Sequence, residues 1–233
     1  MKILAFESTA KAAGVCLCED DKVIAQAYQN SGLTHSTTLM PMAEDLLRNC
    51  GVPLAAVDLL AVAVGPGSFT GLRIGISTVK GLSWGMQKPC IGVSTLEAMA
   101  WNLAHMEGAT VCCAMDARRK QVYNALFHVE GGRLIRVCED RAISLEELAA
   151  QRRGCHILVG DGAELVYQDA IARGHNVVLA PPHLRFQSGW GVARCAWEQL
   201  RNGIQPVSGA ELEANYLRLS QAERERLERS QQV

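Results

Sequence analysis

The order in which apolar segments follow one another is the feature that most constrains how this chain can fold. Residues 2–6 form an apolar run that ends at Glu7, and residues 111–115 form a second run that ends at Asp116. Each run is followed by two alternating segments joined by a short turn, and then by strands and helices in alternation. Both halves of the chain therefore predict the order βββαβαβα. A Rossmann fold alternates from its first strand, so the three-strand opening argues against it.

The predicted segments are defined by apolar periodicity and by turn residues. In the first half we expect strands at 2–6, 14–19, 22–28, 57–64 and 90–93, and helices at 35–50, 69–86 and 95–106. In the second half we expect strands at 111–115, 121–129, 133–139, 156–159 and 176–179, and helices beginning at Ser144 and spanning 162–173 and 188–202. The duplicated pattern predicts an α/β fold of two ribonuclease-H-like lobes, the plan of actin, sugar kinases and Hsp70. We expect the lobes at residues 1–107 and 108–220, and a charged tail at 221–233.

Composition and net charge argue against several classes of protein. The 233 residues carry 23 Lys and Arg against 24 Asp and Glu, a net charge of -1, whereas a dedicated nucleic-acid binder normally has a clear basic excess. The nine cysteines are scattered and include no C-x-x-C pair, so we expect neither a disulfide framework nor a zinc site. No apolar stretch approaches the ~18 residues of a membrane span, and the N-terminus lacks the apolar core of a signal peptide. We therefore expect a cytoplasmic protein that does not bind membranes.

A glycine-rich segment at residues 65–75 joins the predicted strand 57–64 to the helix that follows. The start of a helix after such a loop can bind phosphate. The spacing here matches neither the Walker A pattern, which needs a Lys after the last Gly, nor the dinucleotide pattern G-x-G-x-x-G. Gly67, Gly71 and Gly75 instead recur every four residues, which predicts a smooth stripe along the helix. This stripe could face the chain's own sheet or a helix of a partner.

Glu7 and Asp116 are weak candidates for a nucleotide site. Actin-like ATPases place carboxylates at the ends of these two strands, where such a pair could hold a hydrated Mg²⁺. Neither residue is followed by the glycine that lets a backbone approach phosphate closely. We therefore assign no resident cofactor to the chain, and ATP with Mg²⁺ only to a complex with other subunits. An actin-like ATPase or phosphotransferase that uses Glu7 and Asp116 remains the alternative function.

Several segments closely resemble one bacterial family. They are the opening ILAFEST, His35 before LMPMAEDLL, the run GPGSFTGLRIGISTVKGLSWG, MDARRKQVYNA at residues 115–125, and Tyr216-Leu217-Arg218. In this order they are similar to the tRNA threonylcarbamoyladenosine biosynthesis proteins called TsaB or YeaZ, and the resemblance covers essentially the whole chain. It implies a sugar-kinase and Hsp70-like fold and a role in modifying the adenosine 3′ to the anticodon of tRNA.

The resemblance also implies partners. In that family the transferase chemistry belongs to a paralogue, TsaD, whose metal site uses a His-x-x-x-His motif. The corresponding positions here are Thr95 and Met99, which cannot replace imidazole ligands. We therefore expect a non-catalytic subunit, without a metal site, that binds TsaD. The ATPase subunit TsaE and tRNA would be reached through the same complex, and the isolated chain would form a homodimer.

The partner surface is expected on the two helices 35–50 and 69–86. In the first helix the apolar core face leaves Met40 to one side. In the second helix the glycine stripe and a separate apolar line lie on different sides, so one side can face the sheet and the other a partner helix. The residues predicted for this surface are Met40, Gly71, Leu72, Gly75, Ile76 and Val79.

Overall fold

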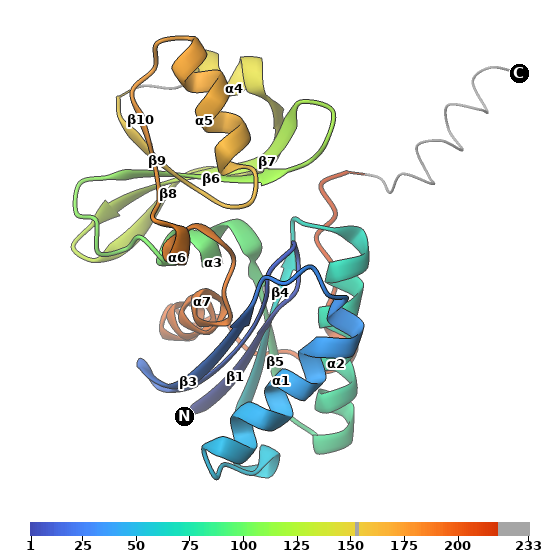
Figure 1. Ribbon diagram of the computed structural model, residues 1–233. Coiled ribbons are helices and arrows are strands. Elements are labelled where there is room, and N and C mark those ends of the chain that lie inside the picture. Colours follow the sequence, from blue (N-terminus) through green and yellow to red (C-terminus); the bar gives the residue numbers. More distant parts are fainter. Residues whose placement is uncertain (152–153, 219–233) are drawn as a thin grey trace, which may run out of the picture.

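The computed structural model describes residues 1–151 and 154–218 and shows two lobes, each built on a five-stranded sheet (Figure 1). The first sheet has the strand order β3-β2-β1-β4-β5, and the second has the order β10-β9-β6-β7-β8. In each sheet the first strand is antiparallel to the second and parallel to the strand that follows the hairpin. The prediction of an α/β fold with two ribonuclease-H-like lobes is therefore confirmed.

The strands of the first sheet are β1 (Lys2–Glu7), β2 (Ala13–Glu19), β3 (Lys22–Gln29), β4 (Leu59–Gly65) and β5 (Cys90–Ser94). All of them except the edge strand β3 are largely buried on both faces. Along β1, Leu4 and Phe6 belong to the core on one face, and Ile3 and Ala5 to the core on the other. Helices α1 (His35–Asn49) and α2 (Phe69–Met86) cover the first of these faces, and α3 (Thr95–Trp101) and α7 (Gly189–Arg201) cover the second (Figure 1). This two-sided burial explains the nearly continuous apolar runs in the sequence.

Helix α3 lies between the two sheets and joins the lobes through a continuous core (Figure 1). Ala98 and Trp101 pack on the first sheet, whereas Leu96 and Met99 pack against residues of the second sheet, including Phe127. The helix is therefore apolar on both sides. Because such a helix has no polar face, periodicity cannot mark its end.

The second sheet carries its own pair of helices. Its strands are β6 (Thr110–Asp116), β7 (Gln121–Glu130), β8 (Arg133–Ser144), β9 (His156–Val159) and β10 (Val177–Leu179), and its helices are α4 (Leu145–Gln151) and α5 (Ala163–Ala172). The helix predicted to begin at Ser144 starts with a capping box, in which the Ser144 N–H also donates to the Glu147 carboxylate at 3.1 Å. The Ser144 hydroxyl donates to the Glu147 carboxylate at 2.7 Å, and the Glu147 N–H donates to the Ser144 hydroxyl at 3.1 Å.

Some element boundaries differ from the prediction. The helix expected at 95–106 ends at Trp101 and continues as turns. Strand β8 runs on to Ser144 rather than ending at 139, because register shifts opposite Leu126 interrupt its alternation. The short helix α6 (Pro182–Arg185) and two 3₁₀ turns, η1 (Leu54–Ala56) and η2 (Gly209–Glu211), were not predicted.

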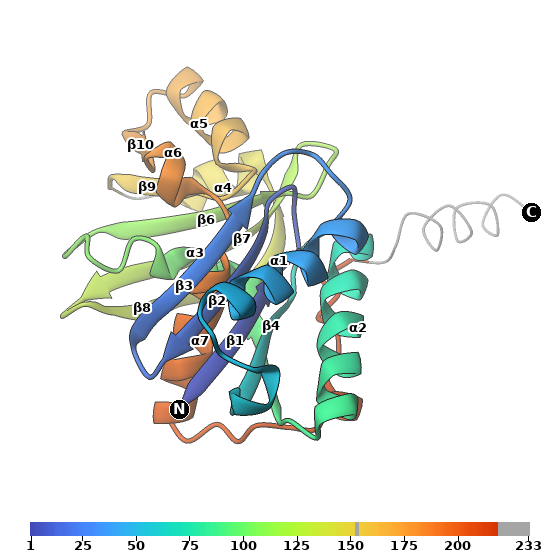
Figure 2. The same cartoon turned by 60° about the horizontal axis from the view of Figure 1, so that its bottom comes forward.

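Helix α7 follows the second lobe in sequence but packs on the first sheet. Gly189 makes this possible, since a Cβ there would lie 2.7 Å from the carbonyl carbon of Val15. The chain then passes along the first lobe from α7 to α2 (Figure 2), where Val207 pairs with Cys90 and the Asn215 N–H donates to the Val64 carbonyl oxygen at 2.7 Å. Much of the segment after residue 188 thus lies on the first lobe, although chain order assigns it to the range 108–220.

Three further expectations concern the C-terminal tail, membrane spans and disulfide bonds. The predicted charged tail at 221–233 lies outside the described residues. Within the part of the chain that the structure describes, no helix has the length and apolar character needed to cross a membrane. The nine cysteines are all free thiols.

Candidate functional site

The glycine-rich segment packs helix α2 against the residues that follow strand β1. A Cβ on Gly71 would overlap the carbonyl oxygen of Ser8, and one on Gly75 would lie 2.5 Å from the Ser8 hydroxyl oxygen. That hydroxyl donates to the Gly71 carbonyl oxygen at 2.9 Å. The stripe therefore faces the chain's own sheet, and Gly71 and Gly75 present no outer surface to a partner.

The apolar line on α2 also belongs to the chain's own core. Leu72, Ile76 and Val79 are only 1%, 7% and 0% exposed. Of the six residues predicted for the partner surface, only Met40 is more than marginally accessible, and it is half-buried. The sequence shows a glycine stripe and a separate apolar line on this helix. It does not show that the sheet, α1 and the C-terminal segment cover both of them.

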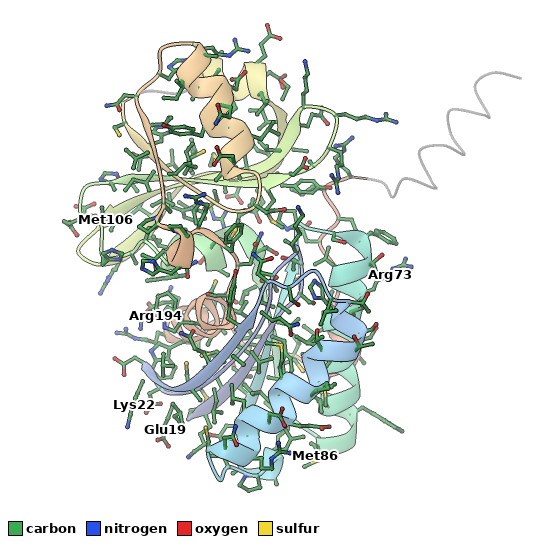
Figure 3. The ribbon with its side chains drawn as sticks, viewed as in Figure 1. Glu19, Lys22, Arg73, Met86, Met106 and Arg194 are labelled. Carbon is green, nitrogen blue, oxygen red and sulfur yellow. The ribbon has the colours of Figure 1, made fainter. Side chains whose placement is uncertain are left out.

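The outward side of α2 carries different residues. It exposes Arg73, Ser77, Gly81 and Trp84, and Trp84, at 83% exposure, is the most accessible large apolar residue in the described part of the chain. Nothing lies within 4 Å of a Cβ placed on Gly81. Figure 3 shows Arg73 and Met86 near opposite ends of this helix. The sequence signal for this outward surface is the position of Trp84, which lies off both the glycine stripe and the apolar line.

The loop before α2 uses its backbone N–H groups internally. The Ser68 N–H donates to the Thr9 carbonyl oxygen at 2.7 Å, and the Gly71 N–H donates to the Ser68 hydroxyl at 3.4 Å. A Cβ on Gly67 would lie 2.6 Å from the same Thr9 oxygen. Two of the N–H groups that could hold a phosphate at the start of α2 are therefore bonded to the chain itself.

Glu7 is buried at the end of β1. Its Oε1 atom accepts hydrogen bonds from the N–H and the hydroxyl of Thr9, both at 2.6 Å. Its Oε2 atom has no hydrogen-bond partner among the described residues. Burial raises the pKa of Glu7 to about 7, although the bonds from Thr9 act in the opposite direction. Near neutral pH this carboxyl group is therefore balanced between its protonated and charged forms.

Two further carboxylates reach the same region from the second lobe. Asp116 ends β6 and accepts a hydrogen bond from the Arg118 N–H at 2.7 Å. Asp161 follows β9, accepts a hydrogen bond from Gln187 at 3.1 Å, and has a pKa raised by burial. Our sequence prediction missed Asp161, although the two glycines that flank it after a buried strand mark a tight turn. The structure thus brings Glu7 and Asp116 towards one region and adds a third carboxylate.

These groups border a cleft of about 440 Å³ between the lobes, with Asp116 and Asp161 in its lining and Glu7 buried beside it. The second-lobe wall includes the turn at 118–120, where three consecutive residues have φ of 65°, 53° and 57°. This left-handed conformation is strained for side chains of Arg and Lys and is typical of functional sites. The cleft is therefore the candidate site between the lobes.

The C-terminal segment forms another side of the cleft. Tyr216 stacks on Phe69 with 4.7 Å between ring centroids, and the Arg73 guanidinium lies 4.0 Å from the Phe69 centroid. Arg218 donates from Nη1 to the carbonyl oxygen of Ala117 at 2.7 Å, so this segment reaches the second lobe. The resemblance at Tyr216-Leu217-Arg218 thus falls on residues that line the cleft.

The positions that correspond to the paralogue's metal ligands lie in the core. Thr95 and Met99 are both 0% exposed, and Met99 packs between the lobes. A neutral hydroxyl and a thioether are poor substitutes for two imidazoles. In the described ranges 1–151 and 154–218, no group of three His, Cys, Asp or Glu side chains is arranged to hold a metal ion. Thr95 and Met99 therefore contribute packing.

Comparisons with known proteins agree with the resemblance seen in the sequence. A family model described as TsaD, tRNA N6-adenosine threonylcarbamoyltransferase, matches residues 24–167. The tRNA threonylcarbamoyladenosine biosynthesis protein TsaB of Escherichia coli (strain K12) is 36% identical over 70% of this chain and 72% of its own length. The chain belongs to the TsaB family. The TsaB of Bacillus subtilis (strain 168) is also 36% identical, over 63% of this chain and just under two thirds (64%) of the relative.

A solved structure extends the likeness to TsaB-type proteins across the whole fold. A Pseudomonas aeruginosa protein, described as uncharacterized with similarity to peptidase YEAZ, superposes with a TM-score of 0.79 at 27% identity. The match covers 93% of this chain and 99% of the other. The two-lobed architecture that shapes the cleft is therefore shared with this structure.

Proposed function

We propose that this chain is a non-catalytic partner subunit in the formation of threonylcarbamoyladenosine on tRNA, and that it binds the paralogue TsaD, which carries the transferase site. The observation that supports this most is the internal use of the loop before α2, where Ser68 and Gly71 N–H groups bond to the chain itself. Family membership supports the tRNA modification, since the curated relatives bear that name. We extend the proposal to the ATPase subunit TsaE and to tRNA as members of the same complex.

An ATPase or phosphotransferase acting through Glu7 and Asp116 is the rival function. Its support is the approach of these carboxylates, with Asp161, to one cleft. Against it stands the environment of Glu7, which is buried and engaged by Thr9 rather than open to a hydrated cation. Calorimetric titration with Mg-ATP separates the two functions, because micromolar binding that disappears in Asp116→Ala would favour the enzyme.

We place the contact with TsaD on the outward faces of α1 and α2. Exposed tryptophans are frequent at the centres of protein interfaces, and Trp84 is 83% exposed on α2. Gly81, one turn earlier, would let a partner helix approach the α2 backbone closely. Met40 on α1 adds a half-buried, adaptable apolar group. A second copy of the chain could occupy the same surface when TsaD is absent.

Reconstituted tRNA modification tests the proposal. With TsaD, TsaE, a threonylcarbamoyl donor and tRNA present, we expect modification only when this chain is added. The variant Trp84→Ala should lower the affinity for TsaD by about tenfold or more, which reduces co-elution on a sizing column. It should lower tRNA modification in proportion. Ile171→Ala is the matched control, because Ile171 is a 50% exposed apolar residue on the second lobe. If both variants bind TsaD equally well, α2 does not form the contact. Full modification without this chain would refute the partner function.

A further inference from the structure

A second cavity lies on the face of the first lobe that is opposite to α1 and α2. Its volume is about 700 Å³, and it is bordered by the edge strand β3, the C-terminal end of α3, α6 and the start of α7. Arg194 of α7 lines it and is labelled on that side of the molecule in Figure 3. The volume falls in the range of roughly 300–1,000 Å³ that is typical of small-molecule sites. Nothing in the proposed partner function uses this cavity.

The apolar part of the cavity is aromatic. Trp101 and Trp190 both contribute to the lining, with Leu184 beside them. Trp101 is only 5% exposed and is held in place, since it packs under the first sheet and under the guanidinium of Arg194, 5.0 Å from its ring centroid. Rigid indole surfaces of this kind favour a planar, aromatic ligand over a flexible aliphatic one.

The one charged side chain among the described residues that line the cavity is a cation, Arg194. His105 and His183 add imidazole groups to the lining, and no Asp or Glu is among its described residues. Glu198 lies 2.6 Å from Arg194, but it also lies 3.6 Å from Arg201, so one carboxylate serves two guanidinium groups. The cavity is therefore suited to an anion, in contrast to the cleft between the lobes.

The polar groups divide into a fixed set and an available set. Asn102 is fixed, because its side chain donates to the carbonyl oxygens of Leu184 and Phe186 at 3.1 and 2.9 Å and accepts from Ser188 at 3.2 Å. The side chains of Gln26 and His105, like that of His183, have no hydrogen-bond partner among the described residues. These side chains are free to meet polar atoms of a ligand. Arg194 can exchange its contact with Glu198, which keeps Arg201 as a partner, for the acceptor atoms of a ligand.

We propose that this cavity binds a small planar aromatic carboxylate. Its ring would lie against Trp190 and the small accessible part of Trp101, and its carboxylate would meet Arg194 and the N–H groups of the two histidines. Arg194 combines both roles, since a guanidinium can stack on an aromatic face and pair with a carboxylate. The site is independent of the α1 and α2 surface, so either proposal can fail alone.

Nuclear magnetic resonance of the four tryptophan indole N–H groups provides the test. The probes are 1-naphthoate and its neutral analogue 1-naphthalenemethanol, titrated into the full chain labelled with ¹⁵N. We expect 1-naphthoate to shift the signals of Trp101 and Trp190 saturably and to leave that of Trp84 in place. The alcohol should bind about tenfold more weakly, because it cannot form a charge-assisted bond to Arg194.

Two cavity variants and one control variant separate binding from folding. Arg194→Gln should reduce the affinity for 1-naphthoate about tenfold, to the level of the alcohol. Gln26→Trp, on the exposed edge strand, should fill the cavity and abolish binding without changing the melting temperature, and Trp84→Ala should leave binding unchanged. Equal affinity for the acid and the alcohol, or shifts confined to Trp84 and Trp197, would overturn the proposal. Indole signals of Trp101 and Trp190 that change on dilution without ligand would assign the face to a second copy of the chain and overturn it as well.

Discussion

Among single residues, burial decides what the carboxylates near the cleft can do. Glu7 is enclosed, and its Oε2 atom lacks a hydrogen-bond partner among the described residues, so its charged form is destabilised. Asp116 has a side chain that is 34% exposed and an arginine beside it. The two residues occupy matching strand ends, yet only Asp116 is open to a ligand in the cleft. Equivalent positions in the two lobes therefore differ in chemistry.

The raised pKa of Glu7 predicts a pH-dependent stability. Between pH 4.5 and about 7 the folded protein keeps a proton on Glu7 that the unfolded chain has lost, so this contribution is fully present below pH 4.5 and disappears as the pH rises through about 7. Glu7→Gln keeps the shape and the acceptor for Thr9 without the charge. We expect it to raise the free energy of unfolding at pH 8 by up to about 3 kcal/mol, with little change at pH 4.5. Urea unfolding at both pH values measures this, and parallel pH profiles of the two proteins would contradict it.

The sequence predicts a residue of the site only where it also predicts the end of a strand. Glu7 and Asp116 each stop an apolar run, so their place at the carboxyl ends of β1 and β6 could be read directly. Asp161 follows the short strand β9, and its role depends on how close that strand lies to β6, which only the sheet order shows. The choice of residues for the partner surface on α2 met a related limit. Periodicity identifies the glycine stripe and the apolar line, which the chain buries, but not the exposed Trp84.

At the scale of elements, the glycines of α2 have two different roles. Gly71 sits where the helix touches the backbone at Ser8, whereas Gly81 faces open space on the outward side. In the first case the missing Cβ permits contact between backbones. In the second case, within the isolated chain, it leaves the helix more flexible and meets no neighbour.

This contrast predicts opposite effects of the same substitution. Gly71→Ala should lower the free energy of unfolding by about 2 kcal/mol or more, because its Cβ would overlap the Ser8 carbonyl oxygen and backbone atoms would have to move. Gly81→Ala should raise it by up to about 1 kcal/mol, since alanine favours the helix and meets no neighbour. Thermal and urea unfolding of both variants measure the difference. A loss of stability in Gly81→Ala, or none in Gly71→Ala, would show that the helix packs differently.

The elements themselves were predicted well wherever one physical signal dominated. The helix at 69–86 and the strand at 156–159 have the expected limits, because a capped start, a turn or a short apolar run defines them. Strand β8 was predicted too short because register shifts interrupt its alternation of apolar and polar residues. Helix α3 was predicted too long because it is apolar on both sides. The position of α7 on the first sheet depends on glycine contacts between distant segments, which no local pattern contains.

In the whole molecule, the two lobes are joined by a polar cluster as well as by the core around α3. Arg136 of β8 donates to Glu97 of α3 at 2.8 Å and to Asp140 at 2.7 Å, and Ser94 donates to Asp140 at 2.5 Å. The Arg136 guanidinium also lies 4.7 Å from the ring centroid of Phe127. The side chains of this cluster are 10–26% exposed, so removing its only cation would leave two partly buried carboxylates close together.

This cluster predicts that the lobes unfold as one unit whose stability depends on Arg136. We expect Arg136→Met to lower the free energy of unfolding by about 2–3 kcal/mol, because Glu97 and Asp140 lose their partner while methionine can still pack on the Phe127 ring. Lys2→Met is the matched control: the Lys2–Glu19 pair has a similar distance, 2.7 Å, but Glu19 is 47% exposed, so the loss should be much smaller than in Arg136→Met. Urea unfolding followed by circular dichroism and by tryptophan fluorescence measures both variants. Equal losses in the two variants would place Arg136 among ordinary surface ion pairs, and separate transitions by the two probes in the wild-type protein would show that the lobes unfold independently.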